Sequence, residues 1–224
     1  MPMVQHDAFG AVPVQYSVTR LPDDPDGQVA ATIGQMRRYA REDAGTPEIQ
    51  REIRTALRQY PGVPAYDAVF HHVKSKTSFR NDVDIVNPIL SRMGGLGGDD
   101  VVETLIRPRD MVVMPSRMGD CDDYSMYGAS MLLGMGYPPH DVMFVTVAAD
   151  PQAPGNFSHV YLAVFDDERK IPLDISHGQY AGWEVPRDRV SRREEWSLAN
   201  PIETAALLAA AAYGAWRLMR GGRG

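Results

Sequence analysis

Apolar residues recur at every third or fourth position in three successive segments of the N-terminal part of the chain. Residues with this spacing share one face of a helix, so the pattern predicts three amphipathic helices. They are expected over about 28–41, 47–60 and 66–73. Asp26 is a suitable N-cap for the first helix, and Thr46 followed by Pro47 begins the second. His71 and His72 on the third helix point about 100° apart, so they are poorly placed to share a metal ion.

The second half of the chain changes from helical spacing to β-branched runs. One more helix is predicted from Cys121 to Met135, before Gly136 and Pro138 end the apolar pattern. Strands are predicted over 141–148, 159–165 and 170–174, the last two as a hairpin around an acidic turn. The segment 178–196 is polar, and we expect it to be an irregular, solvated surface.

The two ends of the chain are predicted to be extensions of one central domain. Residues 1–27 contain several turn formers and little periodicity, which favours an extended arm. Residues 28–199 form the expected domain, and 200–224 an alanine-rich helix and tail. The most apolar part of that helix is shorter than the roughly 20 residues that a membrane span needs, so no span is predicted. Both extensions could bind a protein assembly partner.

Composition narrows the class of protein. The hydrophobic fraction is 44%, the charged fraction 23% and the net charge −6, as in an ordinary globular protein. An acidic chain without a basic patch is not expected to bind nucleic acid. The first residues lack the pattern of a signal peptide, and a single cysteine does not require an oxidising compartment, so a cytoplasmic location is expected. The aspartates at 23, 24 and 26 lack the full ligand pattern of a calcium loop.

Two segments near the centre of the chain differ in what they indicate. Residues 94–98 are mostly glycine and can be read as a lid over a cleft or as a plain connector. Residues 119–127, GDCDDYSMY, hold the one cysteine at the predicted start of a helix. Asp120 is a favourable N-cap there, and Gly119 permits the turn. A helix dipole contributes only about 0.3–1 kcal/mol, which lowers a thiol pKa by less than one unit. Cys121 therefore needs a cationic partner to act as a nucleophile.

His159 is the candidate partner because it begins the second predicted strand. A symmetric turn pairs Phe165 with Lys170, and in this register Asp174 lies diagonally across from His159. The carboxylate could then orient the imidazole. The same register places His177 on the opposite face, away from Asp174.

Three sequence segments carry a family resemblance: GDCDDYSMYGASMLLGMGY, FSHVYLAV and PLDISHG. Over about 107–178 the chain resembles the transglutaminase-like cysteine protease superfamily, including its small bacterial and phage members. The resemblance implies an α+β fold with a papain/transglutaminase-like core, in which N-terminal helices precede a helix packed on an antiparallel sheet. It also implies that Cys121, His159 and Asp174 form a catalytic triad. Animal transglutaminases carry a tryptophan beside the cysteine that this chain lacks, so calcium-dependent crosslinking is not implied.

The residues and the resemblance together predict a cysteine hydrolase or acyltransferase that acts on amide bonds of a peptide or protein, without cofactor or metal. The alternative is a non-catalytic structural protein, such as a phage particle component, which would be associated with the virion. A metal site built from Cys, His and Asp is a weaker hypothesis, because the sequence offers one sulfur and no close histidine pair.

Overall fold

The computed structural model describes residues 21–82, 84 and 104–199. The greater part of the predicted N-terminal arm, the glycine-rich segment 94–98 and the predicted C-terminal helix lie outside the described residues. Of the described helices, none has the length and apolar character needed to cross a membrane.

The three predicted N-terminal helices are confirmed as α1 (Pro25–Asp43), α2 (Pro47–Gln59) and α3 (Ala65–Lys76). Helix α1 begins before the expected position, so the N-cap prediction of Asp26 is wrong. Asp24 is the cap instead, and its Oδ1 accepts a hydrogen bond from the backbone N–H of Gly27 at 2.6 Å. Pro25 then occupies the first helical position, where its missing N–H costs nothing.

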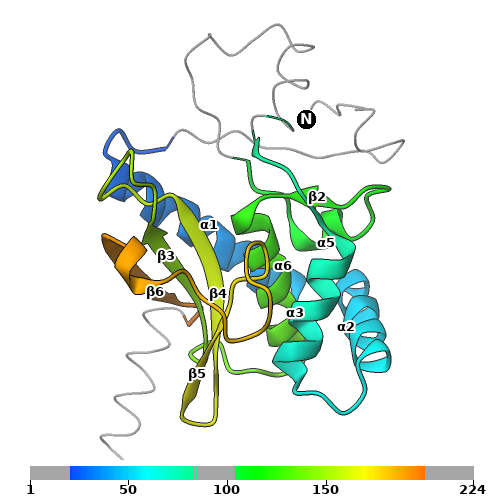
Figure 1. Cartoon of the computed structure of the whole chain (residues 1–224). Helices are drawn as coiled ribbons and strands as arrows, with labels where there is room; N and C mark the ends of the chain where they lie inside the picture. Colours follow the sequence, from blue (N-terminus) through cyan, green and yellow to red (C-terminus); the bar gives the residue numbers. More distant parts are fainter. Residues whose placement is uncertain (1–20, 83, 85–103, 200–224) are drawn as a thin grey trace, which may run out of the picture.

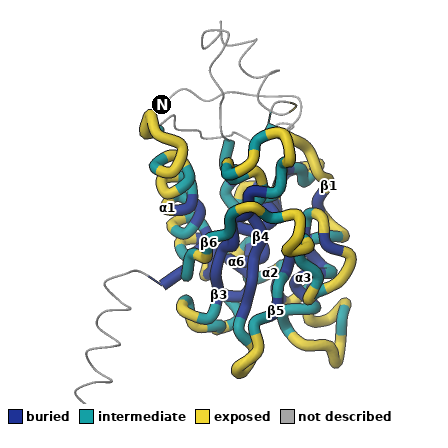
Figure 2. The backbone as a smooth tube through the Cα atoms, turned by 60° about the vertical axis from the view of Figure 1, so that its left-hand side comes forward, coloured by how far each residue is buried: buried dark blue, intermediate teal, exposed yellow. Residues whose placement is uncertain are grey.

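Helix α6 (Cys121–Gly134) is the centre of the molecule. It lies between the sheet on one side and α2 and α3 on the other, and it also contacts α1 (Figure 1). Most of its residues are buried, and buried backbone is concentrated in α6 and the two middle strands (Figure 2). A short helix, α5 (Pro108–Met111), precedes it. A helix that is surrounded in this way holds its first residue in a fixed place relative to the sheet.

The sheet has four strands in the order β5-β4-β3-β6, and all neighbours are antiparallel. The strands are β3 (Val142–Ala148), β4 (His159–Asp166), β5 (Arg169–Leu173) and β6 (Arg192–Ser197). The architecture is therefore α+β, with helices packed on an antiparallel sheet, as expected. Phe165 pairs with Lys170, which confirms the predicted hairpin register.

Strand β6 was not predicted, and the expectation of an irregular segment there is wrong. Its sequence RREEWS is charged, yet it pairs with β3 along its whole length. It is an edge strand, and charged side chains are common on edge strands. Its arginines pair with acids, for instance Arg193 with Glu184 at 2.9 Å.

Candidate functional site

A short parallel strand pair holds the start of α6. Strand β1 (Ser78–Phe79) pairs with β2 (Met118–Gly119), which directly precedes the N-cap Asp120. A Cβ on Gly119 would lie 2.6 Å from the Cβ of Asp123, so a larger residue would displace the helix. The strand pair and this close approach together position Cys121, the first helical residue, whose side chain is partly buried.

The second predicted contact joins β4 to the chain after β5. The Nε2 atom of His159 lies 2.8 Å from Oδ2 of Asp174, so the two residues that were predicted to lie within side-chain reach are in contact. Their side chains are 10% and 0% exposed. Burial alone would raise the pKa of Asp174, but hydrogen bonds from His159 and from the backbone of His177 hold it below its usual value. An ionised carboxylate accepts only, so the proton of this hydrogen bond belongs to Nε2.

Ser125 connects the start of α6 to the start of β4. Its Oγ lies 2.7 Å from the carbonyl oxygen of Cys121 and 3.4 Å from that of Val160. Val160 follows His159 directly, so one hydroxyl reaches the backbone of the cysteine and the backbone beside the histidine. The structure therefore brings together the helix start and the strand start that the sequence separates by 38 residues.

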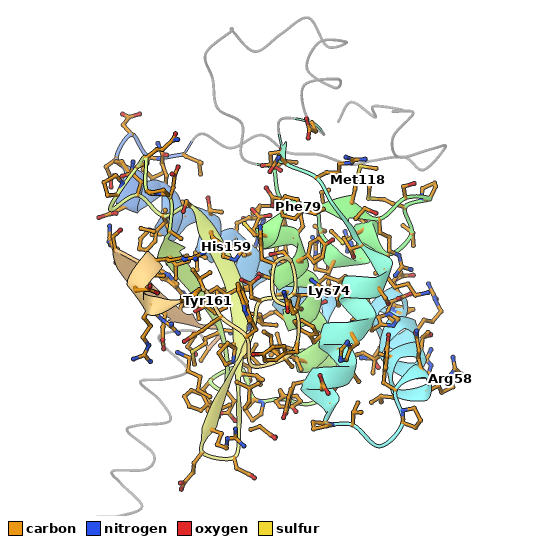
Figure 3. All side chains as sticks on the ribbon, in the orientation of Figure 1. Arg58, Lys74, Phe79, Met118, His159 and Tyr161 are labelled. Carbon is orange, nitrogen blue, oxygen red and sulfur yellow. The ribbon has the colours of Figure 1, made fainter. Side chains whose placement is uncertain are left out.

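His177 does not lie where the extended hairpin register predicted. Strand β5 ends at Leu173, and the chain turns so that the N–H of Gly178 donates to the carbonyl of Asp174 at 2.6 Å. The backbone N–H of His177 donates to Oδ1 of Asp174 at 3.0 Å, and its ring centroid lies 4.7 Å from that of His159. The ring centroid of His177 also lies 5.2 Å from that of Phe79, which Figure 3 labels together with His159. The prediction that His177 faces away from Asp174 is wrong because it assumed a strand past residue 173.

The acidic residues beside Cys121 are more buried than their sequence indicates. Asp122 and Asp123 are almost inaccessible to solvent. Burial, followed by repulsion from neighbouring carboxylates, raises the pKa of both well above the usual value for aspartate. Oδ1 of Asp123 accepts a hydrogen bond from the N–H of Ile106 at 2.7 Å. Protonated carboxyls would oppose a thiolate at Cys121 less than the two charges assumed from sequence.

A largely buried polar cluster around Glu52 was not found from sequence. Glu52 of α2 accepts hydrogen bonds from His72 at 2.8 Å, from Arg117 at 2.7 and 3.0 Å, and from the Tyr127 hydroxyl at 2.8 Å. Arg117 directly precedes β2, the strand that leads into Cys121. The cluster therefore links this segment to α2. His71, by contrast, faces Asp67, which confirms that the two adjacent histidines do not converge.

Two groups of described residues could hold a cation, since the potential ligand atoms within each lie within 4.8 Å of one another. One consists of Asp82, Asp120 and Asp123, next to the start of α6. The other consists of His159, Asp174 and His177.

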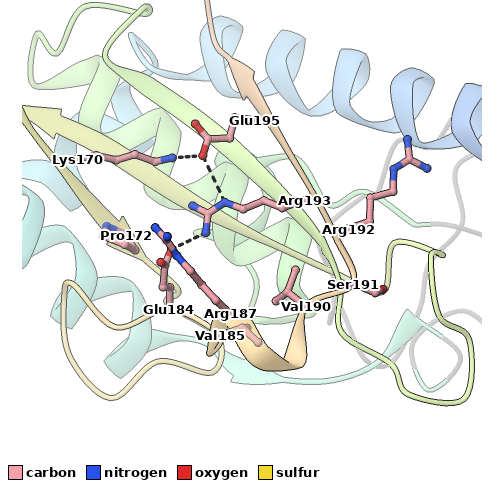
Figure 4. Close-up of a pocket in the computed structure, with 10 residues that line it drawn as sticks. All are labelled: Lys170, Pro172, Glu184, Val185, Arg187, Val190, Ser191, Arg192, Arg193 and Glu195. Carbon is pink, nitrogen blue, oxygen red and sulfur yellow. Dashed lines mark hydrogen bonds and ion pairs between the residues drawn. The ribbon is translucent and has the colours of Figure 1, made fainter.

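A separate cavity of about 580 Å³ lies on the outer side of the sheet and contains none of the three predicted triad residues. Ion pairs link Lys170 to Glu195, Glu195 to Arg193, and Arg193 to Glu184 across it (Figure 4). The hydroxyl of Tyr161 donates to Glu184 at 3.0 Å, which connects this face to the strand that carries His159.

No protein-family model matches the chain, and no curated protein matches it. Among solved structures, the chain aligns with LapG of Legionella pneumophila after EGTA treatment, at a TM-score of 0.43 and 13% identity over 75% of this chain and 86% of that one. Another LapG structure from this organism aligns at a TM-score of 0.42 and 15% identity, over 74% of this chain and 85% of that one. A TGase structure aligns at a TM-score of 0.32 and 13% identity, over 74% of this chain and 36% of that one. These TM-scores and identities identify neither a family nor an activity.

Proposed function

We propose that the protein is a cysteine hydrolase or acyltransferase that acts on amide bonds of a peptide or protein, with Cys121 as nucleophile, His159 as acid and base, and Asp174 as the orienting carboxylate. The observation that carries the proposal is the 2.8 Å contact between Nε2 of His159 and Oδ2 of Asp174. Because Nε2 is held by Asp174, Nδ1 is the nitrogen of His159 that can exchange a proton with Cys121. The packing of the α6 start against β4 through Ser125 supports this pairing.

The chemistry follows from these roles. His159 takes the thiol proton, and the sulfur forms a bond to the amide carbonyl carbon. When the carbon–nitrogen bond breaks, His159 gives that proton to the departing amine and a thioester remains. Water then attacks the thioester, releasing the carboxylic acid and restoring the thiol; an amine in place of water gives transfer. The backbone N–H of Cys121, at the start of a helix, can donate to the oxyanion.

The electrostatics favour this use of Cys121. The partner imidazolium supplies the positive charge that the helix dipole is too weak to replace, and Asp174 stabilises that imidazolium. Asp174 is ionised because its hydrogen bonds hold its pKa down despite burial.

The test is the rate of alkylation of Cys121 by iodoacetamide between pH 5 and 9. An activated thiolate reacts well below pH 8, and His159→Ala should lose this reactivity. His140→Ala is the matched control, because His140 is an exposed histidine beside Asp141 at a different place in the fold. Release of labelled peptides from a protein substrate, compared with Cys121→Ala, then measures turnover.

An ordinary thiol titrating near pH 8.5 in both the wild type and His159→Ala would overturn the proposal. That outcome would favour the alternative of a structural protein that keeps the fold without its chemistry.

A further inference from the structure

Two histidine rings and one carboxylate meet where β4 begins. The rings of His159 and His177 lie 4.7 Å apart at 79° to one another, and Asp174 contacts both residues. One nitrogen of each ring and one carboxylate oxygen all lie within 4.8 Å of one another. A metal site was disfavoured from sequence because no close histidine pair was visible. The turn at 174–178 supplies that pair.

The ligand types suit a transition metal. Two imidazoles and a carboxylate are ligands of Zn²⁺, Co²⁺, Ni²⁺ and Cu²⁺, whereas Ca²⁺ and Mg²⁺ prefer oxygen alone. Tetrahedral zinc with bonds of about 2.0–2.1 Å holds its ligand atoms roughly 3.3 Å apart. The 2.8 Å separation of His159 and Asp174 is close to this value, and an ion would replace the proton between them. His177 must move inward, which its exposed position permits.

The surroundings already orient two of the ligands. Oδ1 of Asp174 accepts hydrogen bonds from the His177 N–H at 3.0 Å and the Ser176 hydroxyl at 3.2 Å, so Oδ2 is the oxygen left for an ion. The same hydroxyl lies 2.9 Å from Nδ1 of His177. Such outer contacts hold ligands in place at metal sites. Lys74 opposes a cation, because its ammonium group donates to the carbonyl of Ile175, the residue after Asp174, at 3.0 Å.

We propose that His159, Asp174 and His177 bind a divalent transition metal of the zinc type, and that the bound ion inhibits the enzyme. Inhibition rests on the proposed function, because the ion would displace the Nε2 proton and take the carboxylate that orients the ring, so His159 could no longer become the imidazolium partner of Cys121. Binding itself does not rest on it. A water molecule would be the fourth ligand.

The binding test is a titration of the whole chain with Co²⁺, followed by its visible absorption, and with Zn²⁺ by calorimetry. We expect intense tetrahedral cobalt bands in the wild type and in His140→Ala, and at least tenfold weaker binding in His177→Ala. Equal binding by the wild type and His177→Ala, with circular dichroism showing both folded, would overturn the site.

The inhibition test is the alkylation rate of Cys121 with and without Zn²⁺ at neutral pH. We expect Zn²⁺ to slow alkylation at least tenfold in the wild type and much less in His177→Ala. Cobalt binding together with an unchanged alkylation rate would overturn the inhibitory role and leave the binding site supported. Cobalt binding to a protein whose thiol is not activated would instead overturn the proposed function, so the two failures are distinguishable.

Discussion

Replacement of Glu52 by glutamine should test whether the polar cluster around Glu52 stabilises the fold, including the segment that leads from Arg117 to Cys121. The Glu52 side chain is 15% exposed and Arg117 is 18% exposed, and their atoms approach to 2.7 Å. Glu52→Gln keeps the shape but leaves the guanidinium of Arg117 without its counter-charge. Breaking a buried ion pair by removing one partner costs about 3–5 kcal/mol. Because both groups keep some contact with water, we expect the lower end, about 3 kcal/mol.

The expected loss corresponds to a Tm lower by about 6–12 °C, since 1 kcal/mol shifts Tm by about 2–4 °C in a domain of this size. The loss should also depend on pH. Burial alone would raise the pKa of Glu52, but hydrogen bonds from His72, Arg117 and Tyr127 hold it well below its usual value. A carboxyl whose pKa falls on folding contributes stability above its unfolded pKa, and that contribution disappears as the pH falls through the folded value. The difference between wild type and variant should therefore be constant from pH 6 to 8 and shrink below about pH 4.5.

The measurement is thermal unfolding followed by circular dichroism at several pH values. Glu48→Gln is the matched control, because Glu48 lies on the same helix and pairs with Arg51 at the surface at 3.1 Å. We expect little change in that variant. A similar Tm for the two variants at pH 7, or a difference that does not shrink in acid, would refute the reasoning.

Two further predictions concern the orienting carboxylate and helix packing. Asp174→Asn should slow alkylation of Cys121 at pH 6 at least tenfold, because the imidazolium loses a carboxylate at 2.8 Å; an unchanged rate would show that Asp174 has no such role. Gly134→Ala should lower stability by about 1–3 kcal/mol in urea unfolding, because its Cβ would lie 2.6 Å from the carbonyl oxygen of Ala44. Gly34→Ala, with no atom near its added Cβ, should instead raise stability by about 0.5–1 kcal/mol; equal effects would contradict the packing argument.

Local patterns were sufficient for the elements that carry the site. Helical spacing predicted α2, α3 and α6, and Asp120 and Cys121 hold the expected positions at the start of α6. The symmetric turn predicted the pairing of β4 with β5, because side-chain alternation has a period of two and a slip would expose the apolar face. The contact between His159 and Asp174 depends on that register and also on the turn that follows Leu173, where β5 ends.

Tertiary structure decided the features that depend on residues far apart in the chain. Glu52 and Arg117 meet only because α2 packs beside α6. Strand β6 forms although its sequence is charged, because an edge strand tolerates charged side chains. His177 reaches His159 because the chain turns at Asp174, where side-chain and backbone hydrogen bonds replace the strand ladder. By itself, then, the sequence determined which elements form and how neighbouring strands pair. Only packing could decide which buried charges meet, because the free energy of a buried charge depends on every element around it.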